Sequence, residues 1–255
     1  MNIERNFFDS HIHFNLYISD PVGELISTIR KSQLDGFELI LNSQHEVDLF
    51  LNNKDRIDEL EVIYGVAVLF DYKNEQFGKF YKKIRKKCNN VSIKIHPRLS
   101  LICHREIELI GEKLNKYDFD VIIVDCFPYT SNTEHFIDLD IAIYLAKQFT
   151  TKKIVLAHSG GCLLLYYMMK TRDIENIIYD LSLSILYFRY SSISLDIQQL
   201  IKFTSSRCIL GSDYPDFEPT DVYCEFERVA NIASLSVEEI QNVACFNAMQ
   251  VYGLV

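Results

Sequence analysis

Short apolar runs alternate with longer amphipathic stretches along almost the whole chain. Runs such as 62–69 and 119–125 are rich in Val, Ile and Leu, which is typical of strands buried on both faces. In 77–88, Phe77, Phe80, Tyr81, Ile84 and Cys88 recur at helical spacing, and another helix start is marked by Asp20 followed by Pro21. Because strands that alternate with helices form right-handed crossovers, the pattern predicts a sheet of parallel strands.

The number of these alternations indicates a closed barrel. Strands are predicted at 7–13, 37–41, 62–69, 91–97, 119–125, 153–158, 175–182 and 208–211, and helices at 21–32, 44–59, 77–88, 104–116, 134–149, 161–172, 193–204, 220–232 and 236–252. Eight alternations in 255 residues predict an α/β protein with a single (β/α)8 TIM barrel over residues 1–255. An open doubly wound sheet would need a glycine-rich turn after an early strand, which the sequence lacks.

The first predicted strand carries two histidines two residues apart. In an extended strand Asp9, His11 and His13 face one way, while Phe8 and Ile12 face the other. Neutral imidazole is the commonest metal ligand in proteins, so both histidines can contact a single ion. Such a triplet also arises by chance, and two structural histidines are the competing interpretation.

Other polar residues fall where predicted strands end, which is where barrel enzymes place their catalytic groups. In strand 91–97, Ser92, Lys94 and His96 alternate with apolar residues, as a polar lumen requires. The ends of the later strands add Asp125, His158, Asp180, Ser182 and Asp213. Convergence of these strand ends predicts one polar site.

Four ordered motifs carry a family resemblance. Asp9-x-His11-x-His13, Lys94-Ile95-His96-Pro97, His158-Ser159-Gly160-Gly161 and Gly211-Ser212-Asp213-Tyr214-Pro215 resemble those of the amidohydrolase superfamily, in the branch related to aminocarboxymuconate semialdehyde decarboxylase. The segment 242–254 is similar to the closing helix of that branch. The resemblance implies that His11, His13 and Asp213 bind one divalent ion. It also implies that His158 is an acid/base that helps to activate water, and that Asp213 takes part in proton transfer.

The chain departs from that family at Asp125, where a third metal-binding histidine is usual. Asp125 can ligate the ion directly, in a more anionic ligand set that favours Mn or Fe over Zn. Alternatively, His158 enters the coordination sphere, or the metal site is weakened and Asp125 is bonded to Lys94. The expected ligands of one divalent ion are His11, His13, Asp125, His158 and Asp213.

Lys94 is the third expected catalytic residue, beside Asp213 and His158. Other members of the superfamily carboxylate a lysine on this strand to bridge two metals, but the missing histidine favours a single ion here. The ammonium group would then bind an anionic part of the substrate. The structural alternative is an ion pair with Asp125 or Asp9.

Composition excludes several other classes of protein. The net charge of −9 disfavours nucleic acid as a partner. Seven widely spaced cysteines are typical of reduced thiols, and the sequence shows neither a secretory signal nor an apolar stretch of the ~20 residues that a membrane span needs. We therefore expect a cytoplasmic protein without membrane contact.

The function expected from the sequence is metal-dependent hydrolysis of a small-molecule amide, ester or lactone. A nonoxidative decarboxylase on the same scaffold and a non-catalytic ligand-binding barrel are the alternatives, and a nuclease of the TatD type is disfavoured by the net charge. The expected partner is a small-molecule substrate, anionic if Lys94 binds it. A homo-oligomer is left open.

Overall fold

The computed structural model describes residues 6–128 and 136–254, which form a barrel of parallel strands. Its strands follow one another around the sheet in chain order: β1 (Phe8–Ile12), β2 (Gly36–Leu41), β3 (Ile63–Leu69), β4 (Val91–Ile95), β5 (Val121–Asp125), β6 (Lys153–Ala157), β7 (Ile177–Asp180) and β8 (Cys208–Ile209). The amide N of Ser10 donates to the carbonyl O of Leu210 at 2.9 Å, and that of Asp213 to His11 at 2.8 Å. These bonds join the β1 edge to the segment after β8, so the predicted (β/α)8 barrel is confirmed.

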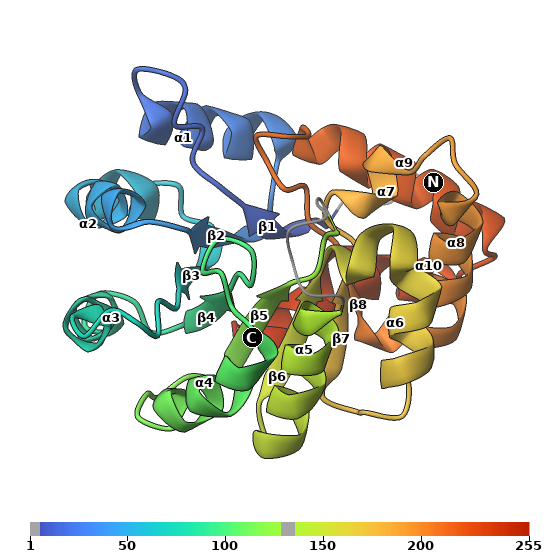
Figure 1. Cartoon of the computed structure of the whole chain (residues 1–255). Coiled ribbons are helices and arrows are strands. Elements are labelled where there is room, and N and C mark those ends of the chain that lie inside the picture. Colours follow the sequence, from blue (N-terminus) through green and yellow to red (C-terminus); the bar gives the residue numbers. More distant parts are fainter. Residues whose placement is uncertain (1–5, 129–135, 255) are drawn as a thin grey trace.

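Helices surround the strands as an outer ring (Figure 1). They are α1 (Pro21–Ser32), α2 (Gln44–Asp58), α3 (Phe77–Arg85), α4 (Ile107–Leu114), α5 (Ile137–Gln148), α6 (Leu164–Thr171), α7 (Ser184–Tyr187), α8 (Ile193–Thr204), α9 (Pro219–Ile232), α10 (Val237–Gln241) and α11 (Asn247–Val251). The one-turn helix α7 was not predicted, and the expected start of α5 at 134 lies outside the described residues. Within the described part of the chain, no helix combines the length and apolar character needed to cross a membrane.

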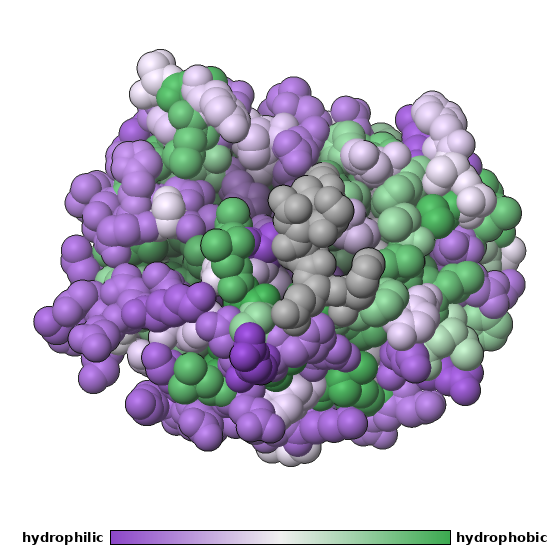
Figure 2. Space-filling view, in the orientation of Figure 1, coloured by the Kyte–Doolittle hydropathy of each residue, from purple (hydrophilic) through white to green (hydrophobic). Residues whose placement is uncertain are grey.

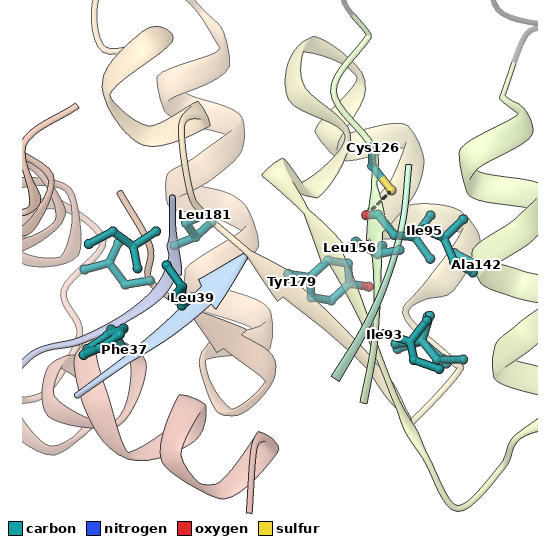
Figure 3. Close-up of a cluster of buried hydrophobic side chains, with 14 of the residues drawn as sticks. Phe37, Leu39, Ile93, Ile95, Cys126, Ala142, Leu156, Tyr179 and Leu181 are labelled. Atoms are coloured by element: carbon teal, nitrogen blue, oxygen red, sulfur yellow. Dashed lines mark hydrogen bonds between the residues drawn. The ribbon is translucent and has the colours of Figure 1, made fainter. Parts of the chain in front are cut away.

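Most strands supply apolar residues to two layers, one between strands and helices and one inside the barrel. In Figure 3, Ile93 and Ile95 of β4 lie with Leu156 of β6 beside Ala142 of α5, in the layer between strands and helices. Ser92 and Lys94, which alternate with these isoleucines, are also buried. Because adjacent side chains of a strand point to opposite faces, the outer layer of β4 is apolar while its inner face is polar.

The first strand breaks this alternation. Phe8 belongs to the inner apolar cluster and Ile12 to the outer one, although they have the same parity. The pairing of β1 with β2 shifts its register between Asp9 and Ile12. The prediction that Phe8 and Ile12 share a face is therefore wrong, because an irregularity in the strand rotates the residues that follow it.

One end of the barrel is closed by the C-terminal helices. The ring of Tyr252 stacks on Phe8 with centroids 6.0 Å apart, and its hydroxyl donates to the carbonyl O of Ser10 at 3.3 Å. In Figure 1 these last helices, drawn in red, run behind the strands. The polar strand ends therefore open on the opposite side of the barrel.

Candidate functional site

Side chains from three strand ends meet at the open end of the barrel. Asp213 Oδ1 lies 3.5 Å from His11 Nε2 and 3.4 Å from His13 Nε2. Donor atoms of His11, His158 and Asp213 all lie within 4.8 Å of one another. Four of the residues expected from the sequence to form one site are thus brought together, although His11 and Asp213 are about 200 positions apart.

The three imidazoles are oriented in the same way. His11 Nδ1 lies 3.0 Å from Asp180 Oδ2, His13 Nδ1 lies 3.1 Å from the carbonyl O of Ile40, and His158 Nδ1 lies 3.1 Å from the carbonyl O of Ser182. Carbonyl and carboxylate oxygens only accept, so Nδ1 carries the proton in a neutral ring. Each Nε2 then presents its lone pair, as a metal-ligating histidine requires.

Asp180 is the side chain that orients His11, and this role was not anticipated. It accepts hydrogen bonds from Ser10 Oγ at 3.0 Å and from Ser182 Oγ at 2.7 Å, in addition to the bond with His11. The signal was present in the sequence, because Asp180 is the polar last residue of an apolar strand. Its contact with His11 could not be anticipated, because the two strands meet only when the barrel closes.

Asp125 lies beside this group and contacts it directly through His158. Its Oδ2 lies 3.4 Å from both Lys94 Nζ and His158 Nε2, and 3.5 Å from His96 Nε2. Its Oδ1 accepts a hydrogen bond from Arg98 Nη2 at 3.1 Å. The contacts with Lys94 and Arg98 correspond to the alternative in which Asp125 is ion-paired. The contact with His158 places Asp125 Oδ2 close enough to the candidate ligands to bind the same ion.

Lys94 lies at the centre of the barrel with only 1% of its surface exposed. Its Nζ is 3.3 Å from His11 Nε2 as well as 3.4 Å from Asp125 Oδ2. Asp9, the other expected partner, instead accepts hydrogen bonds from the amide N and Oγ of Ser212 at 2.8 and 2.6 Å. The ion pair of Lys94 is therefore with Asp125.

The surroundings set the charges of the candidate ligands. Burial alone would raise the pKa of Asp213, but the neighbouring His158, His13 and His11 outweigh it and hold that pKa well below its usual range. Burial and Lys94 lower the pKa of His11. For His158, the opposing effect of burial is outweighed by Asp213 and Asp125, and its pKa is raised. The group thus combines an anionic carboxylate with a neutral His11.

Strained backbone coincides with the site. His158 and Asp213 adopt positive φ values of 62° and 59°. A non-glycine residue in this region costs on the order of 1–3 kcal/mol, and such residues cluster at functional sites. The carbonyl O of His158 accepts a hydrogen bond from Ser184 Oγ at 2.7 Å, which holds the turn in place.

A cavity of about 720 Å³ opens above these groups. This volume is within the range of small-molecule sites. Its floor is polar and its sides are partly apolar. The lining residues are His11, His13, Phe14, Leu16, Tyr17, Asn42, Glu46, Lys94, His96, Arg98, Leu99, Asp125, His158, Asp213, Pro215 and Asp216.

Solved structures share this fold. An uncharacterised TIM-barrel protein from Bordetella bronchiseptica aligns with a TM-score of 0.69 and 8% identity, covering 98% of this chain and 99% of its own. A TatD-family hydrolase from Entamoeba histolytica aligns with 0.67 and 12% (97% and 98% covered), and a zinc-bound amidohydrolase from Burkholderia multivorans with 0.66 and 16% (98% and 99%).

The common feature is the (β/α)8 barrel. No family model matches the chain, and no curated protein does. At such low identity the similarity establishes architecture alone, since one fold supports many chemistries. What the site does must therefore be argued from its own residues.

Proposed function

We propose that this protein is a metal-dependent hydrolase of the amidohydrolase type, a single domain that cleaves an amide, ester or lactone bond of a small molecule. One observation carries the proposal. The Nδ1 atoms of His11, His13 and His158 are each held by an acceptor, which directs their Nε2 atoms to the region beside Asp213. An ion bound there would replace the present contacts of His11 Nε2 with Lys94 and of His158 Nε2 with Asp125.

The donor set fits a divalent ion. His11, His13, His158 and Asp213 would hold it, with Asp125 as a further ligand through Oδ2. Imidazole and carboxylate together suit zinc, and a second carboxylate favours Mn or Fe. A divalent ion bound there supplies Lewis acidity, which activates water and polarises a carbonyl group.

The chain's own residues would handle protons and substrate charge. Asp213 is held anionic and faces the cavity, so it can accept a proton from the attacking water. His158 would pass a proton to the leaving group only in the arrangement in which Asp125, and not His158, ligates the ion, because its Nε2 atom faces Asp125 and the cavity. Arg98 and Lys94 line the same cavity, and their cationic groups support a substrate with an anionic part.

Metal content and turnover test the proposal together. We expect the purified protein to bind about one divalent ion per chain and to hydrolyse members of an ester, lactone and amide panel with added Zn²⁺ or Mn²⁺. His11→Ala should lose both properties and remain folded by circular dichroism. The control is His104→Ala, which removes an exposed imidazole paired with Asp140.

Three results would contradict the proposal. If the protein bound no ion above background, the proposed metal centre would be excluded. Ion binding without turnover of any panel member, together with release of CO₂ from an aromatic carboxylic acid, would indicate the decarboxylase alternative. Tight ligand binding without any reaction would indicate a binding barrel.

A further inference from the structure

Two loops that border the cavity expose large apolar side chains. The loop after β1 carries Leu16, Tyr17 and Ile18, which are 43%, 97% and 37% exposed. The loop after β4 carries Leu99 and Leu101, which are 59% and 78% exposed. Three consecutive exposed apolar residues are unfavourable on a surface that only faces water, so this arrangement calls for a binding role.

These side chains flank the same opening. Leu16 and Tyr17 line the cavity from the loop after β1, and Leu99 lines it from the loop after β4. Figure 2 looks onto this end of the barrel and shows apolar atoms, in green, over both loops. A molecule whose reacting group lies on the polar floor would therefore extend between them.

Both loops are held by their own hydrogen bonds. The amide N of Ser100 donates to the carbonyl O of His96 at 3.0 Å, and that of Ile102 to Pro97 at 2.9 Å. Leu101 takes a positive φ of 48°, a conformation that leucine rarely adopts. On the other side, the amide N of Tyr17 donates to Asn15 Oδ1 at 3.2 Å. The exposed leucines are thus presented by defined turns.

The floor of the cavity is polar and its edge is apolar, and one short segment contributes to both. Arg98 reaches inward to Asp125, whereas its neighbour Leu99 is largely exposed at the edge. A substrate that matches both would have a polar reacting end and an apolar body. Burying apolar surface between the two loops favours binding, and an acetyl-sized substrate is too short to use this surface.

We infer that Leu16, Tyr17 and Leu99 form an apolar clamp that selects substrates in which an extended alkyl chain is attached to the polar reacting end. The position of the reacting bond rests on the proposed hydrolase function. The contact between clamp and apolar group does not.

Binding of a homologous series of carboxylates tests the clamp without any reaction. Acetate, butyrate, hexanoate and octanoate are titrated calorimetrically into the protein, with and without added Zn²⁺. We expect affinity to rise with chain length by up to about fourfold per methylene group, from the transfer free energy of CH₂. In the double variant Leu16→Ser, Leu99→Ser, the gain from butyrate to octanoate should fall by about tenfold, and acetate should bind as before.

The matched control is Leu195→Ser, because Leu195 is 65% exposed on α8 and does not line the cavity. It should keep the full gain with chain length. A gain that is absent from the wild type, or that the double variant retains, would overturn the clamp. A third result would also overturn it. If sedimentation velocity showed a wild-type dimer that dissociates in the double variant, and the carboxylate affinities were unchanged, the leucines would be contacts between two copies of the protein.

Failure of the clamp and failure of the hydrolase function give different results. If the clamp is wrong and the enzyme proposal right, esters of acetate and octanoate are hydrolysed with similar KM values and the carboxylate series shows no gain. If the clamp is right and the protein is not a hydrolase, the gain with chain length appears while every ester stays intact.

Discussion

At the scale of single residues, the candidate metal ligands are oriented by neighbouring groups that are not ligands themselves. Asp180, the carbonyl of Ile40 and the carbonyl of Ser182 set the tautomers of three histidines. Asp180 is fully buried and is itself held by two serines. The donor strength of the site therefore depends on residues that a search for ligands alone would pass over.

Asp180→Asn should weaken the affinity for Zn²⁺ by about 10–100-fold, because the amide cannot orient His11 as a carboxylate does. A competition titration against a chromophoric chelator measures this change. Asp173→Asn, at an exposed carboxylate, is the control and should bind zinc like the wild type. Equal affinities of Asp180→Asn and the wild type would show that His11 needs no such partner.

Glu38 is a second residue whose environment makes a measurable prediction. It is fully buried in β2, and neither carboxylate oxygen makes a well-formed hydrogen bond among the described residues, although the nearby Ser92 hydroxyl opposes the effect of burial on its pKa. Gly65 on the neighbouring strand leaves room for it, since a Cβ there would lie 2.0 Å from Glu38 Oε2. Burial raises its pKa to about 8, so the folded state binds this proton more tightly than the unfolded chain.

Stability should therefore fall as pH rises from about 4.5 to about 8, the interval in which the unfolded chain has lost this proton and the folded state has not. Glu38→Gln removes the titrating group and should flatten this fall, by on the order of a few kcal/mol at pH 8. Urea unfolding at several pH values measures it. Glu59→Gln, an exposed change, should keep the wild-type slope, and the idea fails if Glu38→Gln keeps it too.

At the scale of elements, the turn after β6 decides where His158 points. From His158 to Gly161 every residue has a positive φ, and a Cβ on Gly160 would lie 2.6 Å from Tyr167 Cγ. The Tyr167 ring cannot easily withdraw, because its hydroxyl donates to Asp138 Oδ1 at 2.8 Å. Glycine is thus required here for both its conformation and its small size.

Gly160→Ala should lower the free energy of unfolding by about 2–4 kcal/mol, through backbone strain and overpacking together. Gly253→Ala separates the two causes. Its φ is also positive, at 65°, but a Cβ there would meet no described atom within 4 Å, so only the backbone cost of about 1 kcal/mol is expected. Urea unfolding measures both, and equal losses would exclude the contact with Tyr167.

At the scale of the whole molecule, the barrel depends on contact between the two ends of the chain. Tyr252 packs against Phe8 and donates to Ser10 in β1, which also carries His11. The same strand is bonded to the segment that carries Asp213. The same contacts that close the barrel therefore also bring His11 and Asp213 together.

Tyr252→Ala should cost about 3–5 kcal/mol of stability, because it leaves a cavity at the closed end of the barrel. Tyr252→Phe keeps the ring and loses only the hydrogen bond, so a loss of about 1 kcal/mol is expected. Thermal and urea unfolding measure both variants. A small loss for Tyr252→Ala would mean that the C-terminal helices contribute little to closure.

Most of the architecture could be predicted from local patterns. Helix α1 begins after Asp20, whose side chain caps it, and α8 and α9 lie close to their predicted positions. The apolar stripe of α3 is buried through Phe77, Tyr81 and Ile84 as its spacing indicated. These features depend on residues close together in the sequence, so the sequence displays them.

The site was predictable only in part. The candidate ligands His11, His13, His158 and Asp213 were found because their residue types and order carry information. The irregularity in β1 and the role of Asp180 were missed, since both depend on pairing between strands.

By itself, the sequence determined the alternation of strands and helices, and with it the barrel and the set of polar residues at its open end, because periodicity and local capping act over a few residues. The tertiary structure decided which of those residues meet. Hydrogen bonds across the barrel orient the imidazoles, and the ion pair with Lys94 places Asp125 beside the group, since such contacts arise only when distant segments are packed together.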